Sequence, residues 1–185
     1  TQIQQDLRAT ADIVTRELRR SGYWNNATTS TVWSPLGASA PSNGYQTFSL
    51  RGNPGAVHDV TFAYSKRAGP SPLVNAPTNA ELFGYRLNAV NKTIEARMGA
   101  AGWQTLTDPT VLVITQFDIT PVEDVIVVPC ANACPGGGTA CWPQQSMVNV
   151  TVEISGQAAH DPNVKRSVQS GVRIRNDRIT GVCPS

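Results

Sequence analysis

The sequence has few charged residues and no long apolar run. Charged side chains make up 15% of its 185 residues, whereas soluble domains usually contain about a quarter. The formal net charge of +2 is too small to indicate a nucleic-acid partner. No stretch of about 18 apolar residues occurs, so no part of the sequence is predicted to cross a membrane as a helix.

The common catalytic and phosphate-binding motifs are also missing. The sequence contains no G-x-S-x-G, no H-E-x-x-H and no glycine loop followed by lysine and a helix. Two histidines precede aspartates, at His58 and His160. Neighbouring residues of a strand point to opposite faces, so neither pair forms a ready-made dyad. We therefore expect a protein that is not an enzyme and that uses no cofactor or metal.

The cysteines are few but lie together in the last third of the chain, at Cys130, Cys134, Cys141 and Cys183. An even number in a chain with 15 glycines and 13 prolines predicts two disulfides and an oxidising compartment. Three pairings are possible, and we favour one local bridge within 130–141 plus one long bridge to Cys183. The spacings C-x3-C and C-x6-C lack the C-x2-C pair typical of a four-thiolate zinc site.

The N-terminal residues have the clearest periodicity. One helical stripe, spaced by three or four residues, consists of Ile3, Leu7, Ala11, Val14 and Leu18. The opposite face is charged, and Asp12 precedes Arg16 by four residues, which favours an ion pair between them. Gly22 is a suitable helix terminator. The pattern predicts a helix over 1–22. Basic residues cluster at the end of this helix and again at positions 173, 175 and 178, and both clusters are expected to be solvent-exposed faces.

The remaining residues, 23–185, predict a β-rich body within a single domain, 1–185. A long loop is expected over 23–44, and a cysteine-bearing loop over 129–143. Alternating apolar residues and turn signals predict strands over 57–65, 82–89, 92–98, 103–106, 111–119, 125–128, 147–155 and 168–174. One helix followed by antiparallel strands indicates the α+β class, with the helix packed on an antiparallel sheet.

Four segments of the sequence carry short motifs. The predicted helix contains DLR at 6–8 and RELRRSGY at 16–23, and the body contains FGYRL at 83–87 and VRIRN at 172–176. These segments resemble the acidic-Leu-Arg start and charged end of the helix, a strand and the tail of the PilW-type minor pilins of type IV pili, which belong to the pilin-like and pseudopilin superfamily. The helix and the tail cover about a fifth of the chain.

The resemblance implies a structural role in pilus assembly and initiation, with a place at the pilus tip as one option. Its expected partners are other minor pilins and the major pilin. Prepilins begin with an apolar segment that this sequence lacks, so Thr1 is expected to lie partway along a longer helix anchored in the inner membrane. The protein would be periplasmic or extracellular and would end in the pilus. The stripe would pack on the protein's own sheet, leaving an assembly surface at Arg8, Asp12, Arg16 and Arg19.

Two alternatives remain open. The first is a minor pseudopilin of a type II secretion system, similar to the GspJ type. The Arg-Asn ending favours a pilus protein over this alternative only weakly. The second is a secreted surface-binding module, in which four tryptophans would form a platform for stacking against a carbohydrate, namely Trp24, Trp33, Trp103 and Trp142.

Overall fold

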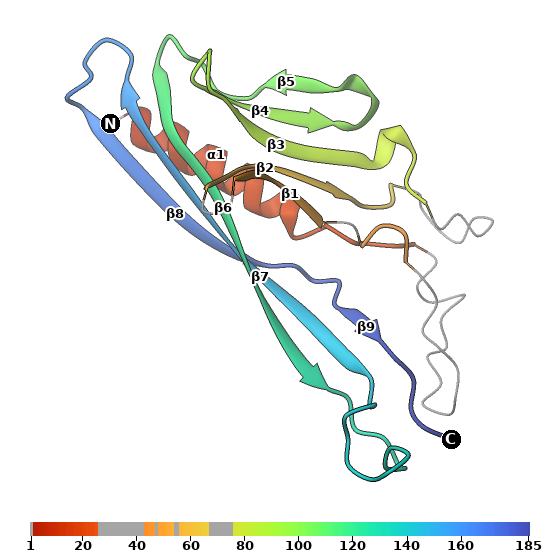
Figure 1. The fold of residues 1–185 in the computed structure, drawn as a ribbon. Helices are drawn as coiled ribbons and strands as arrows, with labels where there is room; N and C mark the ends of the chain where they lie inside the picture. Colours follow the sequence, from red (N-terminus) through yellow and green to blue (C-terminus); the bar gives the residue numbers. More distant parts are fainter. Residues whose placement is uncertain (1, 26–42, 47, 54–55, 67–75) are drawn as a thin grey trace.

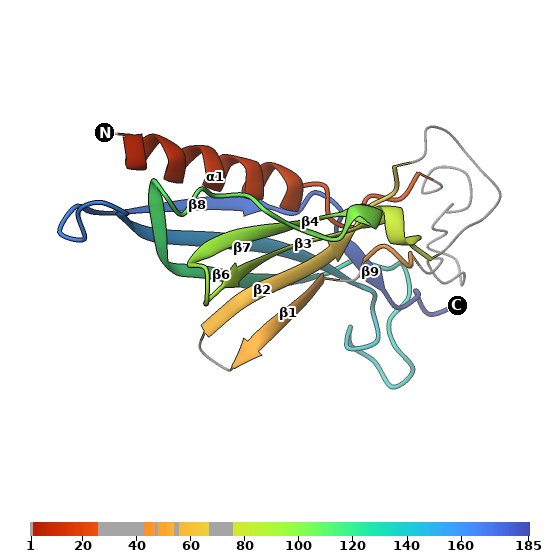
Figure 2. The ribbon, with the colours of Figure 1, turned by 90° about the horizontal axis from the view of Figure 1, so that it is seen from above.

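The computed structural model of the chain describes residues 2–25, 43–46, 48–53, 56–66 and 76–185. One helix, α1 (Gln2–Leu18), packs on two antiparallel sheets (Figure 1). Figure 2 shows α1 along one side of the molecule, with strands on its other side. The predicted α+β class, with an N-terminal helix on antiparallel sheets, is therefore confirmed. Trp33 and most of the predicted 23–44 loop lie outside the described residues.

The first sheet is a five-stranded meander in the order β1-β2-β3-β4-β5. Its central hairpin was predicted from the sequence. The Asn88 side-chain oxygen accepts the N–H groups of Val90 and Asn91 and closes the turn, where Lys92 has a φ of 56°. The strands are β1 (Phe48–Asn53), β2 (Ala56–Ala63), β3 (Leu82–Asn88), β4 (Thr93–Met98) and β5 (Trp103–Thr105), with short 3-10 helices at Asn79–Glu81 and Gly99–Ala101.

The second sheet is built on two long strands. β6 (Leu112–Val127) pairs along its length with β7 (Gln144–Ala158). The opposite edge of β7 pairs first with β9 (Arg178–Thr180) and then with β8 (Lys165–Arg173). Two strands were not predicted from the sequence, β1 and β9, and the expectation that the last strand ends at residue 174 was wrong.

Pro121 explains the largest error in the predicted strands. We expected separate strands at 111–119 and 125–128, but the structure has one strand that runs through Pro121. Proline has no N–H to donate and is therefore confined to sheet edges. β6 is such an edge, because among the described residues it pairs with β7 alone. The missing donor lies on the side of β6 that faces away from β7, so the ladder continues.

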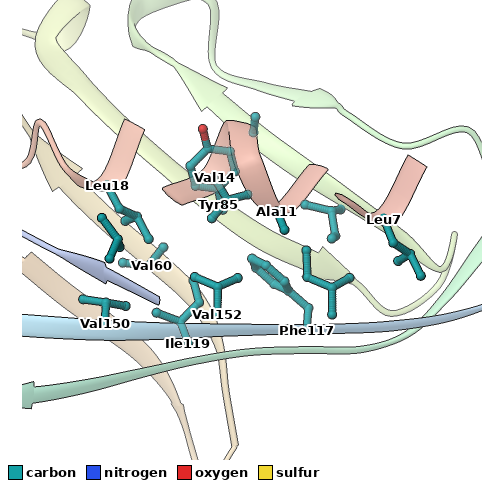
Figure 3. Packing of buried hydrophobic residues seen from close by; sticks show 14 of the residues in the cluster. Leu7, Ala11, Val14, Leu18, Val60, Tyr85, Phe117, Ile119, Val150 and Val152 are labelled. Atoms are coloured by element: carbon teal, nitrogen blue, oxygen red, sulfur yellow. The ribbon is translucent and has the colours of Figure 1, made fainter. Parts of the chain in front are cut away.

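The core lies where α1 meets both sheets (Figure 3). Phe117 and Ile119 from β6, and Val150 and Val152 from β7, face the helix together with Tyr85 from the first sheet. The helix contributes the whole predicted stripe, and each of its members is buried: Ile3, Leu7, Ala11, Val14 and Leu18. The periodicity of the helix therefore arises from packing against this chain's own strands.

The helix ends earlier than the sequence predicted, at Leu18 instead of near Gly22. Residues 19–22 form turns, and Gly22 has a φ of 77°, a left-handed conformation that favours glycine. Two hydrogen bonds hold this exit in place. The Gly22 N–H donates to the Ala63 carbonyl at 2.8 Å, and the Asn176 side-chain amide donates to the Ser21 carbonyl at 2.8 Å. The helix exit is thereby joined to both sheets.

The β6–β7 ribbon extends past the end of α1 and ends in the cysteine-bearing loop (Figure 1). Cys134 is bonded to Cys141 within the loop, whereas Cys130 is bonded to Cys183 near the C-terminus. The favoured arrangement of one local and one long bridge is the one found. The N-terminus of α1 lies at one end of the molecule and this loop at the other. A single domain over 1–185 stays a prediction.

Candidate assembly surface

The outer face of α1 and the first residue after it carry the four residues predicted to form an assembly surface, and all four are exposed: Arg8, Asp12, Arg16 and Arg19. At 100° per residue they fall within one narrow stripe. The buried stripe that packs on the strands lies on another side of the helix. The fold therefore leaves this charged stripe to solvent along the length of the helix.

Among the described residues, Asp12 and Arg16 do not form the expected ion pair. Arg16 instead approaches its neighbour Glu17, with 4.0 Å between nitrogen and oxygen, and Arg20 approaches the same carboxylate at 3.6 Å. Glu17 also accepts the Tyr64 hydroxyl from the first sheet at 2.7 Å. Because this carboxylate is mostly shielded by the protein, it attracts both guanidinium groups more strongly than the exposed Asp12 does.

Tyr64 lies beneath the basic end of the helix. The guanidinium carbon of Arg20 is 4.2 Å from the centre of the Tyr64 ring, a cation–π contact. Burial and the hydrogen bond to Glu17 raise the pKa of Tyr64 well above its ordinary value. The phenol therefore stays protonated and keeps donating to Glu17. This arrangement holds Arg20 against the sheet and leaves Arg16 and Arg19 directed outward.

A concavity of about 490 Å³ lies at the C-terminal end of the helix and has a strongly basic lining: Arg16, Arg19, Arg20, Tyr23, Arg175 and Asn176. The Arg175 N–H donates to the Arg19 carbonyl at 3.5 Å, which joins the segment after β8 to the helix end. Neither Arg19 nor Arg175 has a carboxylate partner among the described residues. Guanidinium groups without partners are well suited to bind carboxylates in two-point hydrogen bonds.

This basic concavity was not predicted from the sequence. Arg19 and Arg175 are 156 positions apart in the chain, and the packing of α1 against β8 brings them together. The sequence showed two separate basic clusters, which we expected to be solvated faces. The one available signal was that both clusters lie in the segments that resemble minor pilins, at 16–23 and 172–176.

The tryptophans do not gather into the platform that the surface-binding alternative requires. Trp24 is buried in a small cluster with Tyr45 and Ala63. Trp103 on β5 has the Arg86 guanidinium 4.3 Å from its ring centre. Trp142 lies in the disulfide-bearing loop, where its indole N–H donates to the Asn132 carbonyl at 2.9 Å. The three described tryptophans therefore lie on separate parts of the fold and have different contacts.

Two shielded carboxylates have structural partners. Burial favours the neutral form of Glu81, but hydrogen bonds from the Thr78 N–H, the Tyr45 hydroxyl and the Lys66 N–H outweigh it and lower the pKa. Asn88 and then Arg86 lower the pKa of Glu95 in the same way. In the described part of the chain, no three His, Cys, Asp or Glu side chains are grouped as metal ligands.

Membership in a known family is shown by comparison with known proteins. The family model described as prepilin peptidase-dependent protein B matches residues 1–174. No curated protein and no solved structure matches the chain. No helix in the described ranges is both long enough and apolar enough to span a bilayer. Proteins of pilin-like families are generally structural, extracytoplasmic and pilus-associated. The chain belongs to the prepilin peptidase-dependent protein B family and is therefore a pilin-related protein.

Proposed function

We propose that this chain is a minor pilin of a type IV pilus that acts as a structural subunit in pilus assembly and initiation, not as an enzyme. The observation that carries the proposal is the division of α1 into two faces. One face is buried against the chain's own strands. The other exposes Arg8, Asp12 and Arg16, and Arg19 extends it directly after the helix end. A helix that is packed against its own protein on one side and exposes charges on the other can contact neighbouring subunits without disturbing the core.

The orientation of the helix supports the same role. Its N-terminus lies at the end of the molecule opposite the disulfide-bearing loop (Figure 1). An apolar helix upstream of Thr1 would place an inner-membrane anchor at the first end and direct the loop away from the membrane. In this proposal the body lies in the periplasm, contacts other minor pilins and the major pilin, and enters the pilus, with the tip as one position.

Electrostatics indicate which neighbours would fit. The basic concavity adds Arg175 and Tyr23 to the charged stripe, and Arg19 and Arg175 lack carboxylate partners within the described ranges. Acidic side chains of an adjacent subunit would complete bidentate pairs there. Such pairs contribute mostly to specificity and to the rate of association, because exposed charges are screened by salt.

The test uses the native full-length gene. Arg16→Glu combined with Arg19→Glu reverses the charge of the surface, and Arg166→Glu reverses an exposed arginine at the start of β8 as a matched control. We expect the double variant to reduce the number of pili, and the recovery of other minor pilins with this protein, at least tenfold. The control should leave both unchanged, and the isolated bodies should melt at similar temperatures.

Normal pilus numbers with the folded double variant would contradict the assembly surface. A strain lacking the gene that keeps its pili but loses type II secretion would instead identify a pseudopilin. The two outcomes are separated by counting pili in electron micrographs and by measuring secreted substrates in the same cultures.

A further inference from the structure

The second half of β6 has backbone groups that pair with nothing in the described structure. The Val128 N–H donates to the Pro143 carbonyl of the neighbouring segment at 2.8 Å. In an antiparallel ladder, alternate residues direct both their N–H and C=O groups to the same side. Residues 122, 124 and 126 therefore face β7, whereas Glu123, Val125 and Val127 direct theirs away from it.

Two prolines limit this free edge. Pro121 and Pro129 fall on the same outward-facing alternation as Val125, and neither has an N–H to donate. The hydrogen-bonding window is therefore three residues, Glu123, Val125 and Val127, each with one donor and one acceptor. A window of this length matches an extended segment of about five to seven residues.

The side chains around the window are unusually apolar for an exposed strand. The exposed fractions are 55% for Val122, 51% for Val125, 46% for Ile126 and 48% for Val127. Because side chains alternate along a strand, Val125 and Val127 lie on the face that continues from the core, and Val122 and Ile126 lie on the other. Prolines and charges commonly blunt exposed sheet edges, and here they shorten the edge but leave four apolar side chains exposed beside its free N–H and C=O groups.

The charge of this edge indicates what kind of strand would pair with it. Residues 121–129 contain Glu123 and Asp124 and no basic residue. Both carboxylates have a partner within this chain. The Arg178 guanidinium lies 3.6 Å from the Glu123 carboxylate, and the Asn149 side-chain amide donates to the Asp124 carboxylate at 3.2 Å. A second copy of β6 would bring two more carboxylates to this edge. A strand with lysine or arginine at the cross-strand positions fits better.

We propose that the free edge of β6 binds an extended segment of a partner protein as an added strand. The segment is apolar at alternate positions and carries a lysine or arginine opposite Glu123 or Asp124. Main-chain hydrogen bonds to Glu123, Val125 and Val127 provide the attachment, and the exposed valines and Ile126 select the side chains. This site is separate from the helix surface of the proposed minor pilin and goes beyond that function.

The first test is a titration of the isotope-labelled protein with the peptide Lys-Val-Thr-Val-Thr-Val-Lys, blocked at both ends, followed by amide NMR. In the free protein we expect fast hydrogen exchange at the amides of Val125 and Val127 and slow exchange at Ile126. Saturating peptide should slow exchange at the first two at least tenfold. The same peptide with proline at its centre serves as the control and should have no effect.

The second test separates the backbone from the side chain. Val125→Pro removes the outward N–H but no bond to β7, so it should weaken binding at least tenfold and leave the fold intact. Val125→Thr keeps the N–H and should bind within about threefold of the original chain. Ile126→Pro removes a bond to β7 and should lower the melting temperature, which checks the assigned alternation.

Three results would overturn the proposal. One is slow exchange at Val125 and Val127 in the free protein, since the edge would then be covered already. Another is peptide binding that is absent, or unchanged by Val125→Pro. The third is protection of these amides by raising the concentration of the protein alone, which would identify a second copy as the occupant. A failed pilus-assembly test would leave all these measurements unaffected.

Discussion

Truncation of Leu7 to alanine tests how α1 is held. The Leu7 side chain is 0% exposed and lies in the core between the helix and the strands. Leu7→Ala removes three carbon atoms, and their transfer from water contributes about 2.4 kcal/mol at roughly 0.8 kcal/mol each. The remaining cavity raises the expected loss in the free energy of unfolding to about 3–4 kcal/mol. For a chain of this size that loss lowers the melting temperature by about 6–16 °C.

The adjacent residue provides the matched control, because Arg8 is exposed on the outer face. Arg8→Ala should change the free energy of unfolding by less than about 0.5 kcal/mol. The assay is urea denaturation of each variant followed by far-ultraviolet circular dichroism, with melting curves as a second measure. A loss below about 1 kcal/mol for Leu7→Ala, or equal losses for the two variants, would refute the packing of the helix on its own sheets.

Three further measurements test the disulfides, the buried carboxylate and a close contact. From the closed loops of 53 and 7 residues, replacing Cys130 and Cys183 by alanine should cost about 4 kcal/mol of unfolding free energy, and replacing Cys134 and Cys141 about 2 kcal/mol. Urea denaturation would contradict this expectation if loss of the Cys134–Cys141 bridge lowered the free energy of unfolding more than loss of the Cys130–Cys183 bridge. The pKa of Glu81 is lowered from the ordinary 4.5, so its stabilisation is present above that value and is lost as the pH falls through the lower folded-state pKa. Glu81→Gln should therefore flatten the acid limb of a stability-against-pH curve, and an unchanged limb would refute the assignment. A Cβ at Gly84 would lie 2.6 Å from the Val60 carbonyl oxygen, whereas one at Gly171 would meet nothing within 4 Å. Gly84→Ala should destabilise the protein by about 1–3 kcal/mol and Gly171→Ala should not, as thermal melting can check.

The parts of the fold that could be predicted from the sequence have a local physical cause. The stripe from Ile3 to Leu18 repeats with the helical period because one face is buried. β7 alternates because Val150, Val152 and Ile154 face the core. The Asn88 turn closes its hairpin through its own side chain. In each case the residues that determine the structure lie within a few positions of one another.

The errors have non-local causes. Strands were expected at 111–119 and 125–128, but β6 continues through Pro121 between them, because in the described part of the chain only the side of β6 that faces β7 is paired. β9 is a three-residue strand whose pairing depends on the far end of β7. Arg16 lies near Glu17 instead of the expected Asp12, because Tyr64 and the first sheet shield the Glu17 carboxylate from solvent.

The candidate assembly surface also has one part that could be predicted from local sequence and one part that could not. The exposure of Arg8, Asp12, Arg16 and Arg19 follows from the helical period. The basic concavity that joins Arg19 to Arg175 depends on a contact between distant segments.

The most direct measurement of the assembly role is site-specific photo-crosslinking in cells that carry the native full-length gene. A photoreactive amino acid replaces Arg19, directly after the end of α1, or, as the control, Asn163 in the exposed turn between β7 and β8. We expect that Arg19 crosslinks to another pilin-type subunit and that the product is found in sheared pili, whereas Asn163 gives no such product. Crosslinking from Asn163 but not from Arg19, with both variants stably folded, would contradict the assignment of the helix surface to subunit assembly.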